Sequence, residues 1–192
     1  MAGKKFDLQK IFKAMRWLLM AWGGISLVGV LFLAGFFAYQ VGPGNRDKFE
    51  QASVKDVRFV LNWCGLGEKR TERVIHSYQS GRSFTGDHFD AYWIKISNLS
   101  IKELCPPQSG LGHGGWYRGD QLPKVPDEAL QFIMMFPNHR EAPWFPTAKE
   151  IRSSRYFVQV WFVQYHGDHV TNAQVIIARP DDSMIFYISG KT

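Results

Sequence analysis

The sequence predicts an α+β protein that carries a single transmembrane helix near its N-terminus. Two observations support this class: residues 17–39 form an uninterrupted apolar run, and residues 156–189 contain three β-rich runs joined by tight turns. Apolar residues make up 45% of the 192 residues and charged residues 21%. That composition is ordinary for a folded protein and excludes disordered and collagen-like classes.

Residues 17–39 are the predicted transmembrane helix. The run has 23 residues and contains no Asp, Glu, Lys or Arg. As a helix it spans roughly 34 Å, enough to cross a hydrocarbon core of about 30 Å. A cleaved signal peptide is the alternative, but the run is about twice as long as a usual signal core, and Ala38-Tyr39-Gln40 lacks the small residues of a cleavage site. We therefore expect an uncleaved anchor.

Most of the positive charge precedes this apolar run. Residues 1–16 carry five Lys and Arg side chains against Asp7, a net of +4 out of +6 for the chain. The positive-inside rule then predicts a cytoplasmic tail over residues 1–16 and an extracytoplasmic position for residues 40–192. We expect a cell membrane, the bacterial inner membrane, with the C-terminal domain periplasmic or extracellular. Residues 40–192 carry a net charge of only +2, so no nucleic-acid partner is expected.

Beyond the anchor, we expect a linker over 40–48, because Val41-Gly-Pro-Gly-Asn45 breaks regular structure, and one domain over 49–192. Ser53-Val-Lys-Asp56 resembles a capping box and predicts a helix that ends near Gly65. Residues 57–63 also alternate between apolar and polar side chains, so a strand stays open there. The apolar spacing over 68–80 predicts a second helix.

The middle of the domain is expected to alternate short elements with two long loops. Residues 88–97 are β-prone and predict a strand, and residues 101–104 fit one helical turn. A helix is predicted over 127–136 because Pro137 stops it, and Thr147-Ala-Lys-Glu150 is a capping box that opens a short helix. The loops cover residues 105–126 and 137–146.

The C-terminus predicts a three-stranded meander over residues 156–165, 170–179 and 184–189. With Gly167-Asp168 as a two-residue turn, paired residue numbers on the first two strands sum to 335. One face of the meander then forms the core, and the other is only half apolar. The core side chains expected from these two strands are Val158, Val160, Phe162, Ala173, Val175 and Ile177.

The element order therefore reads α-α-β-α-β-β-β and predicts helices packed on one curved antiparallel sheet, an α+β roll. That general plan is similar to cystatin-like and NTF2-like domains. The resemblance is architectural, because no motif carries it. It implies a domain of the kind that serves as a non-catalytic assembly part when anchored in a membrane, as in secretion-type complexes.

Two cysteines, Cys64 and Cys105, lie in the extracytoplasmic portion. An even count in an oxidising compartment favours one disulfide between them. Such a bond would reduce the entropy of the unfolded chain and so stabilise the fold by roughly 4 kcal/mol. Two separate buried thiols are the alternative, since free cysteine behaves as a small apolar residue. No local signature indicates a cysteine nucleophile.

The best candidates for chemistry are two Gly-Asp-His tripeptides, each directly before a predicted strand. Asp87 and His88 belong to the first tripeptide, and His169 ends the second with His166 just before it. Imidazole and carboxylate are ordinary zinc ligands, so a metal site in a small envelope enzyme, or a ligand-binding module, is the alternative function. Glycine and aspartate also make tight turns, and the common hydrolase motifs are absent, so we expect no cofactor and no catalysis.

The function that the sequence favours is protein–protein interaction in a membrane or envelope assembly. The long loops carry adjacent aromatic residues, Trp116-Tyr117 and Trp144-Phe145. Tyr and Trp in loops are typical contact residues, so these four are the predicted partner-binding residues. The alternative is that they fold back and cover the open end of the sheet. Expected partners are the lipid bilayer and other membrane or envelope proteins.

Overall fold

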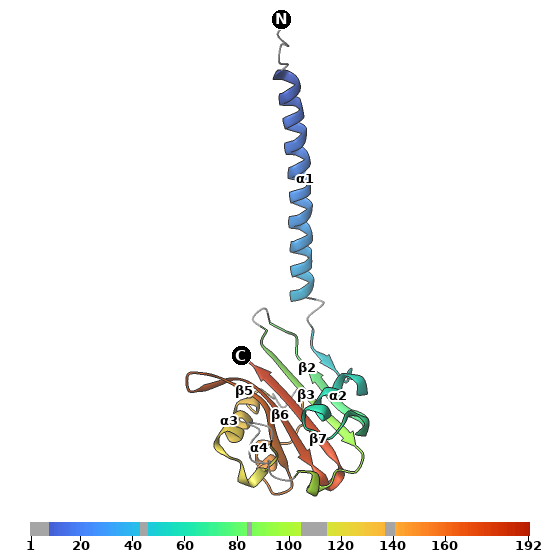
Figure 1. The fold of residues 1–192 in the computed structure, drawn as a ribbon, viewed down its shortest axis with the longest axis vertical. Helices are drawn as coiled ribbons and strands as arrows, with labels where there is room; N and C mark the ends of the chain where they lie inside the picture. The colour runs from blue at the N-terminus through green and yellow to red at the C-terminus, as the bar shows by residue number, and fades with distance from the viewer. Residues whose placement is uncertain (1–7, 43–45, 84–85, 105–114, 137–140) are drawn as a thin grey trace, which may run out of the picture. The chain divides into compact units, whose positions relative to one another are not determined.

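A computed structural model describes residues 8–42, 46–83, 86–104, 115–136 and 141–192. The chain forms two units, residues 1–45 and residues 46–192 (Figure 1). The first unit contains helix α1, and the second is an α+β domain built on a seven-stranded antiparallel sheet. The predicted α+β class is therefore confirmed.

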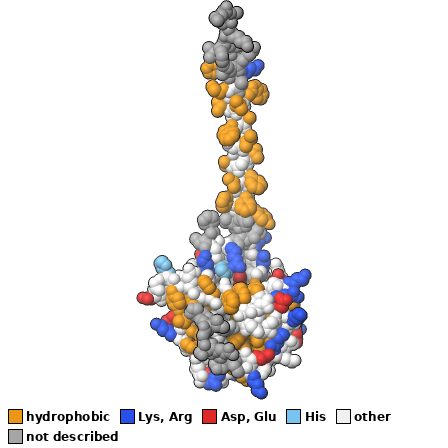
Figure 2. Space-filling view, viewed as in Figure 1, with side chains coloured by type: hydrophobic (Ala, Val, Ile, Leu, Met, Phe, Trp, Pro, Cys, Tyr) orange, Lys and Arg blue, Asp and Glu red, His pale blue; other side chains and the backbone are white. Residues whose placement is uncertain are grey.

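Helix α1, Leu8–Val41, is 34 residues long. Within it, Met15–Tyr39 has a mean hydropathy of 2.0, and none of its most apolar stretch is buried against protein. Figure 2 shows hydrophobic side chains along its length. The helix is long and apolar enough to cross a membrane, a property that membrane anchors share with signal sequences.

The sheet has the strand order β1-β2-β3-β7-β6-β5-β4. All neighbouring strands are antiparallel, and the four longest pairings join β2 to β3, β3 to β7, β7 to β6 and β6 to β5. The two outermost strands have only two residues each, so they cover little of the strands beside them. The strands are β1 Lys48–Phe49, β2 Thr71–Gln79, β3 His88–Ile96, β4 Tyr117–Arg118, β5 Phe157–His166, β6 His169–Arg179 and β7 Met184–Lys191.

The helices of the domain lie on both faces of this sheet, and each face has its own hydrophobic core. Helix α2, Val54–Trp63, packs over Tyr92 and Ile94 of β3. Helix α3, Lys124–Ile133, packs over Phe89 and Ala91, which point to the opposite face of the same strand. The expected roll, with all helices on one face, differs from this arrangement. Each central strand is consequently apolar on both sides.

Strand β2 replaces the helix that was expected over 68–80. Only Glu68–Arg70 is helical, as a single 3-10 turn. Register shifts between Thr71 and Arg73 and between Val74 and His76 mark two irregularities in the pairing with β3. Such bulges break the apolar alternation of a strand. The remaining spacing of Val74, Ile75 and Tyr78 imitates a helix, which explains the wrong prediction.

Most other predicted elements are confirmed. Helix α2 begins with the Ser53 to Asp56 capping box, and helix α4, Ala148–Ile151, begins with the Thr147 to Glu150 capping box. Helix α3 begins three residues before Asp127, because a proline is tolerated in the first turn. Further 3-10 turns lie at Ile101–Leu104, Gly119–Gln121 and Pro180–Asp182.

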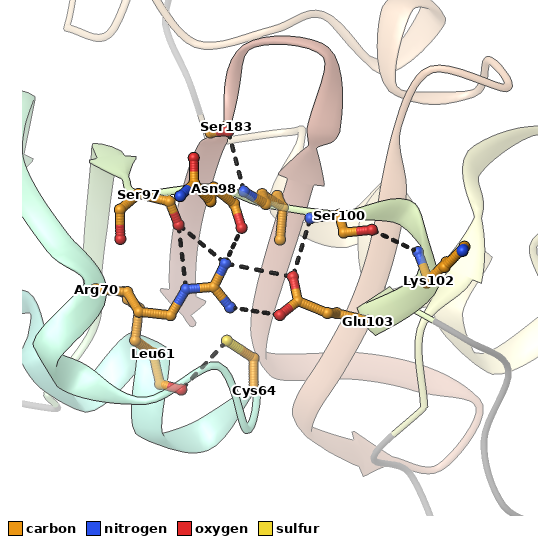
Figure 3. Close-up of polar contacts among 10 residues, drawn as sticks. Leu61, Cys64, Arg70, Ser97, Asn98, Ser100, Lys102, Glu103 and Ser183 are labelled. Carbon is orange, nitrogen blue, oxygen red and sulfur yellow. Dashed lines mark hydrogen bonds and ion pairs between the residues drawn. The ribbon is translucent and has the colours of Figure 1, made fainter.

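An arginine clamp fixes the connection after β3 (Figure 3). The guanidinium of Arg70 donates to the carbonyl of Ser97 at 2.9 and 3.1 Å and to the carbonyl of Asn98. It also pairs with the Glu103 carboxylate at 2.9 Å, and the backbone N–H of Ser100 donates to that carboxylate at 2.9 Å. One side chain thereby ties the start of β2 to the 3-10 turn that follows β3.

Candidate functional site

Strand β5 presents an open edge. On one side it pairs with β6 along its whole length, but on the other side β4 pairs only with Phe157 and Val158. Among the described residues, no strand pairs with the outer side of 160–166. We call these residues the open edge. An open edge presents unpaired backbone N–H and C=O groups that another chain can use.

A bulge places two aromatic side chains together on this strand. The β5–β6 pairs sum to 335 up to Val160, then shift so that Phe162 pairs with Gln174. Trp161 is the extra residue, so Trp161 and Phe162 both lie on the α2 side of the sheet, while Val163 packs against the α3-side core. The predicted core position of Phe162 is therefore wrong. We call Trp161 and Phe162 the aromatic pair.

The aromatic pair is accessible although it lies on an otherwise well-packed sheet. Trp161 and Phe162 are each 41% exposed. Trp161 stacks on Trp63, the last residue of α2, with ring centroids 5.1 Å apart. Trp63 in turn contacts Phe59, with centroids 4.5 Å apart. Helix α2 thus supports Trp161 through Trp63, and both members of the aromatic pair stay partly exposed to solvent.

A polar pocket of about 490 Å³ opens on the same face of the sheet, near β1, β2 and β3. The Asp90 side chain in its wall is only 10% exposed, and one carboxylate oxygen accepts from Arg82 at 2.7 Å. The other oxygen, Oδ1, is buried and has no hydrogen-bond partner among the described residues. A buried acceptor without a donor is energetically costly, by about 1–3 kcal/mol.

Tyr92 lies two residues after Asp90 on β3 and lines the same pocket. Its hydroxyl oxygen accepts a hydrogen bond from the Gln79 amide at 2.6 Å. Burial, together with the nearby Asp90 carboxylate, raises the pKa of Tyr92 to about 12. The hydroxyl therefore keeps its proton at neutral pH and remains a hydrogen-bond donor.

The four aromatic residues predicted to bind a partner have different positions. Trp116 is buried in the α2-side core, and Phe145 is buried in the α3-side core. Trp144 is half-buried and stacks on His76, with centroids 5.3 Å apart, while Tyr117 lies half-buried in β4. Burial favours the alternative that Trp116 and Phe145 complete the cores. Partner binding by the four residues stays a prediction.

The predicted metal ligands are not brought together in the part of the chain that the structure describes, where no group of three or more His, Cys, Asp or Glu side chains has metal-binding geometry. His88 hydrogen-bonds to the Gly86 carbonyl at 2.9 Å and to the Ser189 hydroxyl at 3.2 Å. His166 and His169 face each other across the two-residue β5–β6 turn, as expected. Asp87 hydrogen-bonds through its backbone N–H to Ser83 at 2.8 Å, which is turn chemistry.

Cys64 is a buried free thiol beside the arginine clamp, and it contacts the Leu61 carbonyl at 3.5 Å (Figure 3). Burial raises the pKa of this thiol to about 12. Cys105 lies outside the described residues, so its pairing with Cys64 stays a prediction. Leu104, the residue before Cys105, belongs to the same core cluster as Cys64.

The open edge and the polar pocket were both missed as functional features by sequence reasoning. The half-apolar second face of the meander was a signal for the aromatic pair, since it included Trp161. The pocket gave no signal, because its residues come from β1, β2, β3, helix α2 and the segments beside them, and β2 was predicted as a helix. Comparison of the chain with protein-family models, curated proteins and solved structures found no match.

Proposed function

We propose that the protein is a single-pass membrane protein whose domain binds a partner protein through the open edge of β5. The observation that carries the proposal is the ten-residue strand β5, on which residues 160–166 have no strand beside their outer side among the described residues. An exposed aromatic pair lies beside that edge. The partner is another membrane or envelope protein that contributes an extended segment. The role is non-catalytic: it needs hydrogen-bonding groups and apolar contact, and no reacting group.

Strand addition explains why these two features occur together. An added strand pairs its backbone with the open edge, which supplies affinity, and its alternate side chains meet the neighbouring surface, which supplies specificity. Trp161 and Phe162 are large, and Trp161 is already held by Trp63. Little side-chain entropy is lost when a partner covers such a residue, which suits a contact residue.

The proposal includes an orientation. The N-terminal helix acts as an uncleaved anchor, residues 1–16 are cytoplasmic, and the domain is extracytoplasmic in a cell membrane, the bacterial inner membrane. The charge distribution supports this, because the +4 net charge of residues 1–16 directly precedes the apolar helix. An alkaline phosphatase fusion after residue 192 should be active, and an inactive fusion would reverse the orientation.

Site-specific photo-crosslinking in cells tests the partner interaction. A benzoyl-phenylalanine at position 162 should crosslink to one partner protein, whereas the same group at Met135, which is 75% exposed after α3, should not. The double variant Trp161→Ala/Phe162→Ala should reduce recovery of that partner while the domain stays folded. Hydrogen exchange on the purified complex should then show new protection of the outward-facing backbone amides in 160–166.

Two results would contradict the proposal. Equal crosslinking from positions 162 and 135 would show that the aromatic pair is not a specific contact. A partner bound without new amide protection along β5 would rule out strand addition, even if the side chains take part.

The polar pocket supports a second candidate function, a ligand-binding module. The buried Oδ1 of Asp90 favours it, because this atom has no hydrogen-bond partner among the described residues and is suited to a ligand's hydrogen-bond donor.

A further inference from the structure

The pocket beside β1, β2 and β3 is separate from the open edge, which lies on the far side of β7 and β6 in the sheet. We infer that this pocket binds a neutral, polyhydroxylated ligand of the saccharide class, with a ligand hydroxyl held between Asp90 Oδ1 and the Tyr92 hydroxyl. The inference does not depend on the proposed partner binding, because no residue of the open edge lines the pocket.

The two carboxylate oxygens of Asp90 differ in their hydrogen bonds. Its Oδ2 accepts from Arg82 at 2.7 Å, so that oxygen is satisfied within the protein. Its Oδ1 is buried and has no partner among the described residues. A carboxylate oxygen only accepts hydrogen bonds, so the group that completes it is a donor, an O–H or an N–H.

The hydroxyl of Tyr92 is available as a hydrogen-bond donor. Its oxygen already accepts from Gln79, and its own proton is directed to no acceptor in any hydrogen bond of the described residues. Asp90 and Tyr92 are alternate residues of one strand, so both side chains lie on the same face of the sheet. The pocket wall therefore offers an acceptor and a donor from the same face of β3. A hydroxyl group complements both at once, whereas an ammonium group, which only donates, complements one.

The charged side chains of the pocket balance one another. The pocket is lined by two basic side chains, Lys48 and Arg82, and two acidic ones, Asp56 and Asp90. Arg82 already balances Asp90 at 2.7 Å, and Lys48 is among the charges that lower the pKa of Asp56. A second cation at Asp90 would be repelled by Arg82, and an anion would meet both carboxylates. A neutral ligand avoids both penalties.

The pocket has the size and the lining of a small-molecule site. A volume of about 490 Å³ lies within the usual range for small-molecule sites. Phe59 adds an aromatic wall next to the polar groups, and Gln51 and Gln79 add amide side chains. Several fixed polar groups beside an aromatic ring suit a sugar, which has hydroxyls on its rim and C–H groups on its ring faces.

Saturation-transfer NMR on the full chain in lipid nanodiscs tests the inference, because nanodiscs contain no sugar detergent. The probes are methyl α-glucoside and N-acetylglucosamine, with ethylammonium and acetate as the charged comparisons and empty nanodiscs as the blank. We expect saturation transfer to at least one sugar and none to either ion. Asp90→Ala should weaken the sugar's affinity by about tenfold or more, the usual effect of removing a charged hydrogen-bond partner.

Two further variants keep the test decisive. Tyr92→Phe retains the ring and removes only the hydroxyl, so it should also weaken sugar binding if Asp90→Ala does not fold. Asp120→Ala is the matched control, because Asp120 pairs with Arg118 beside β4, at the opposite border of the sheet. It should bind like the unaltered protein. The inference is overturned if neither sugar binds, if ethylammonium binds instead, or if folded Asp90→Ala and Tyr92→Phe proteins bind sugar normally.

Discussion

The indole of Trp161 lies flat on the indole of Trp63, with ring centroids 5.1 Å apart and ring planes 4° from parallel. This stack joins the bulge of β5 to the last residue of α2. The extra residue of the bulge therefore has a partner on a helix from a distant part of the sequence. Phe162, the next residue, pairs with Gln174 and lies on the same side of the sheet.

The two members of the stack should differ in their effect on stability. Trp63 also packs against Phe59 and Tyr187, so Trp63→Ala should lower the free energy of unfolding by about 3 kcal/mol. Trp161→Ala removes a ring that is 41% exposed and should lower it by only about 1 kcal/mol. Denaturant unfolding followed by circular dichroism measures both values. Equal losses would show that the stack alone determines the stability of this region.

Gly119 should tolerate no side chain. A Cβ atom placed there would lie 1.9 Å from the Ile151 carbonyl oxygen and 2.8 Å from the Ser153 carbonyl oxygen, both backbone atoms. Gly119→Ala should therefore destabilise the domain by about 3 kcal/mol or more, because backbone must move. Gly65→Ala is the control: its Cβ would meet nothing within 4 Å, and only the positive φ of 73° costs about 1 kcal/mol. Thermal unfolding of the two variants compares these effects, and a similar loss in both would contradict the steric argument.

The arginine clamp should make stability depend on acidic pH. The hydrogen bond from the Ser100 N–H, and then the Arg70 guanidinium, lower the pKa of Glu103. The carboxylate's contribution to stability is therefore complete above the unfolded-state pKa of about 4.3, and it is lost as pH falls through the lower folded-state value. Glu103→Gln should be less stable than the unaltered protein at pH 7 and should show a shallower loss of stability below about pH 4.5.

Unfolding titrations between pH 2 and pH 7 test this dependence. Glu72→Gln is the control, because Glu72 is exposed on β2 and its carboxylate makes no hydrogen bond or ion pair within the described residues. It should keep the acid slope of the unaltered protein. An unchanged acid slope in Glu103→Gln would show that the clamp contributes nothing to the pH dependence.

Trp144 should contribute to stability as part of the α3-side core. Its ring stacks on His76 and lies against Trp93, with centroids 5.3 and 6.4 Å apart. Trp144→Ala should lower the free energy of unfolding by about 3 kcal/mol, as truncation of packed aromatics does. A shift of only a degree or two in melting temperature, with weaker partner recovery in a crosslinking pull-down, would instead support the predicted partner-binding role of this residue.

Local signals predicted much of the fold from sequence. The capping boxes at Ser53 and Thr147 give the helix starts, and the Gly167-Asp168 turn gives the register of the hairpin at its two ends. These features work because a cap or a tight turn depends on a few adjacent residues. The antiparallel meander and its α3-side core follow from them.

Bulges account for the main failures. Near Ile75 and at Trp161 an extra residue reverses which face the following side chains take, so simple alternation assigns them wrongly. The candidate sites depend on those reversals. The aromatic pair exists because of the bulge at Trp161, and the pocket requires β2 to be a strand beside Asp90. Neither arrangement can be read from the spacing of residues along one segment.

In the reduced protein, the reactivity of the buried Cys64 thiol reports local opening of the domain. Because burial raises the pKa of Cys64 to about 12, the thiol is protonated at pH 7 and the closed domain reacts slowly with alkylating reagents. The thiol lies within the core under α2, and a reagent reaches it only after that layer separates from the sheet. The alkylation rate of Cys64 therefore reports how often α2 separates from the sheet. A ligand in the neighbouring pocket would lower that rate if it holds α2 to the sheet.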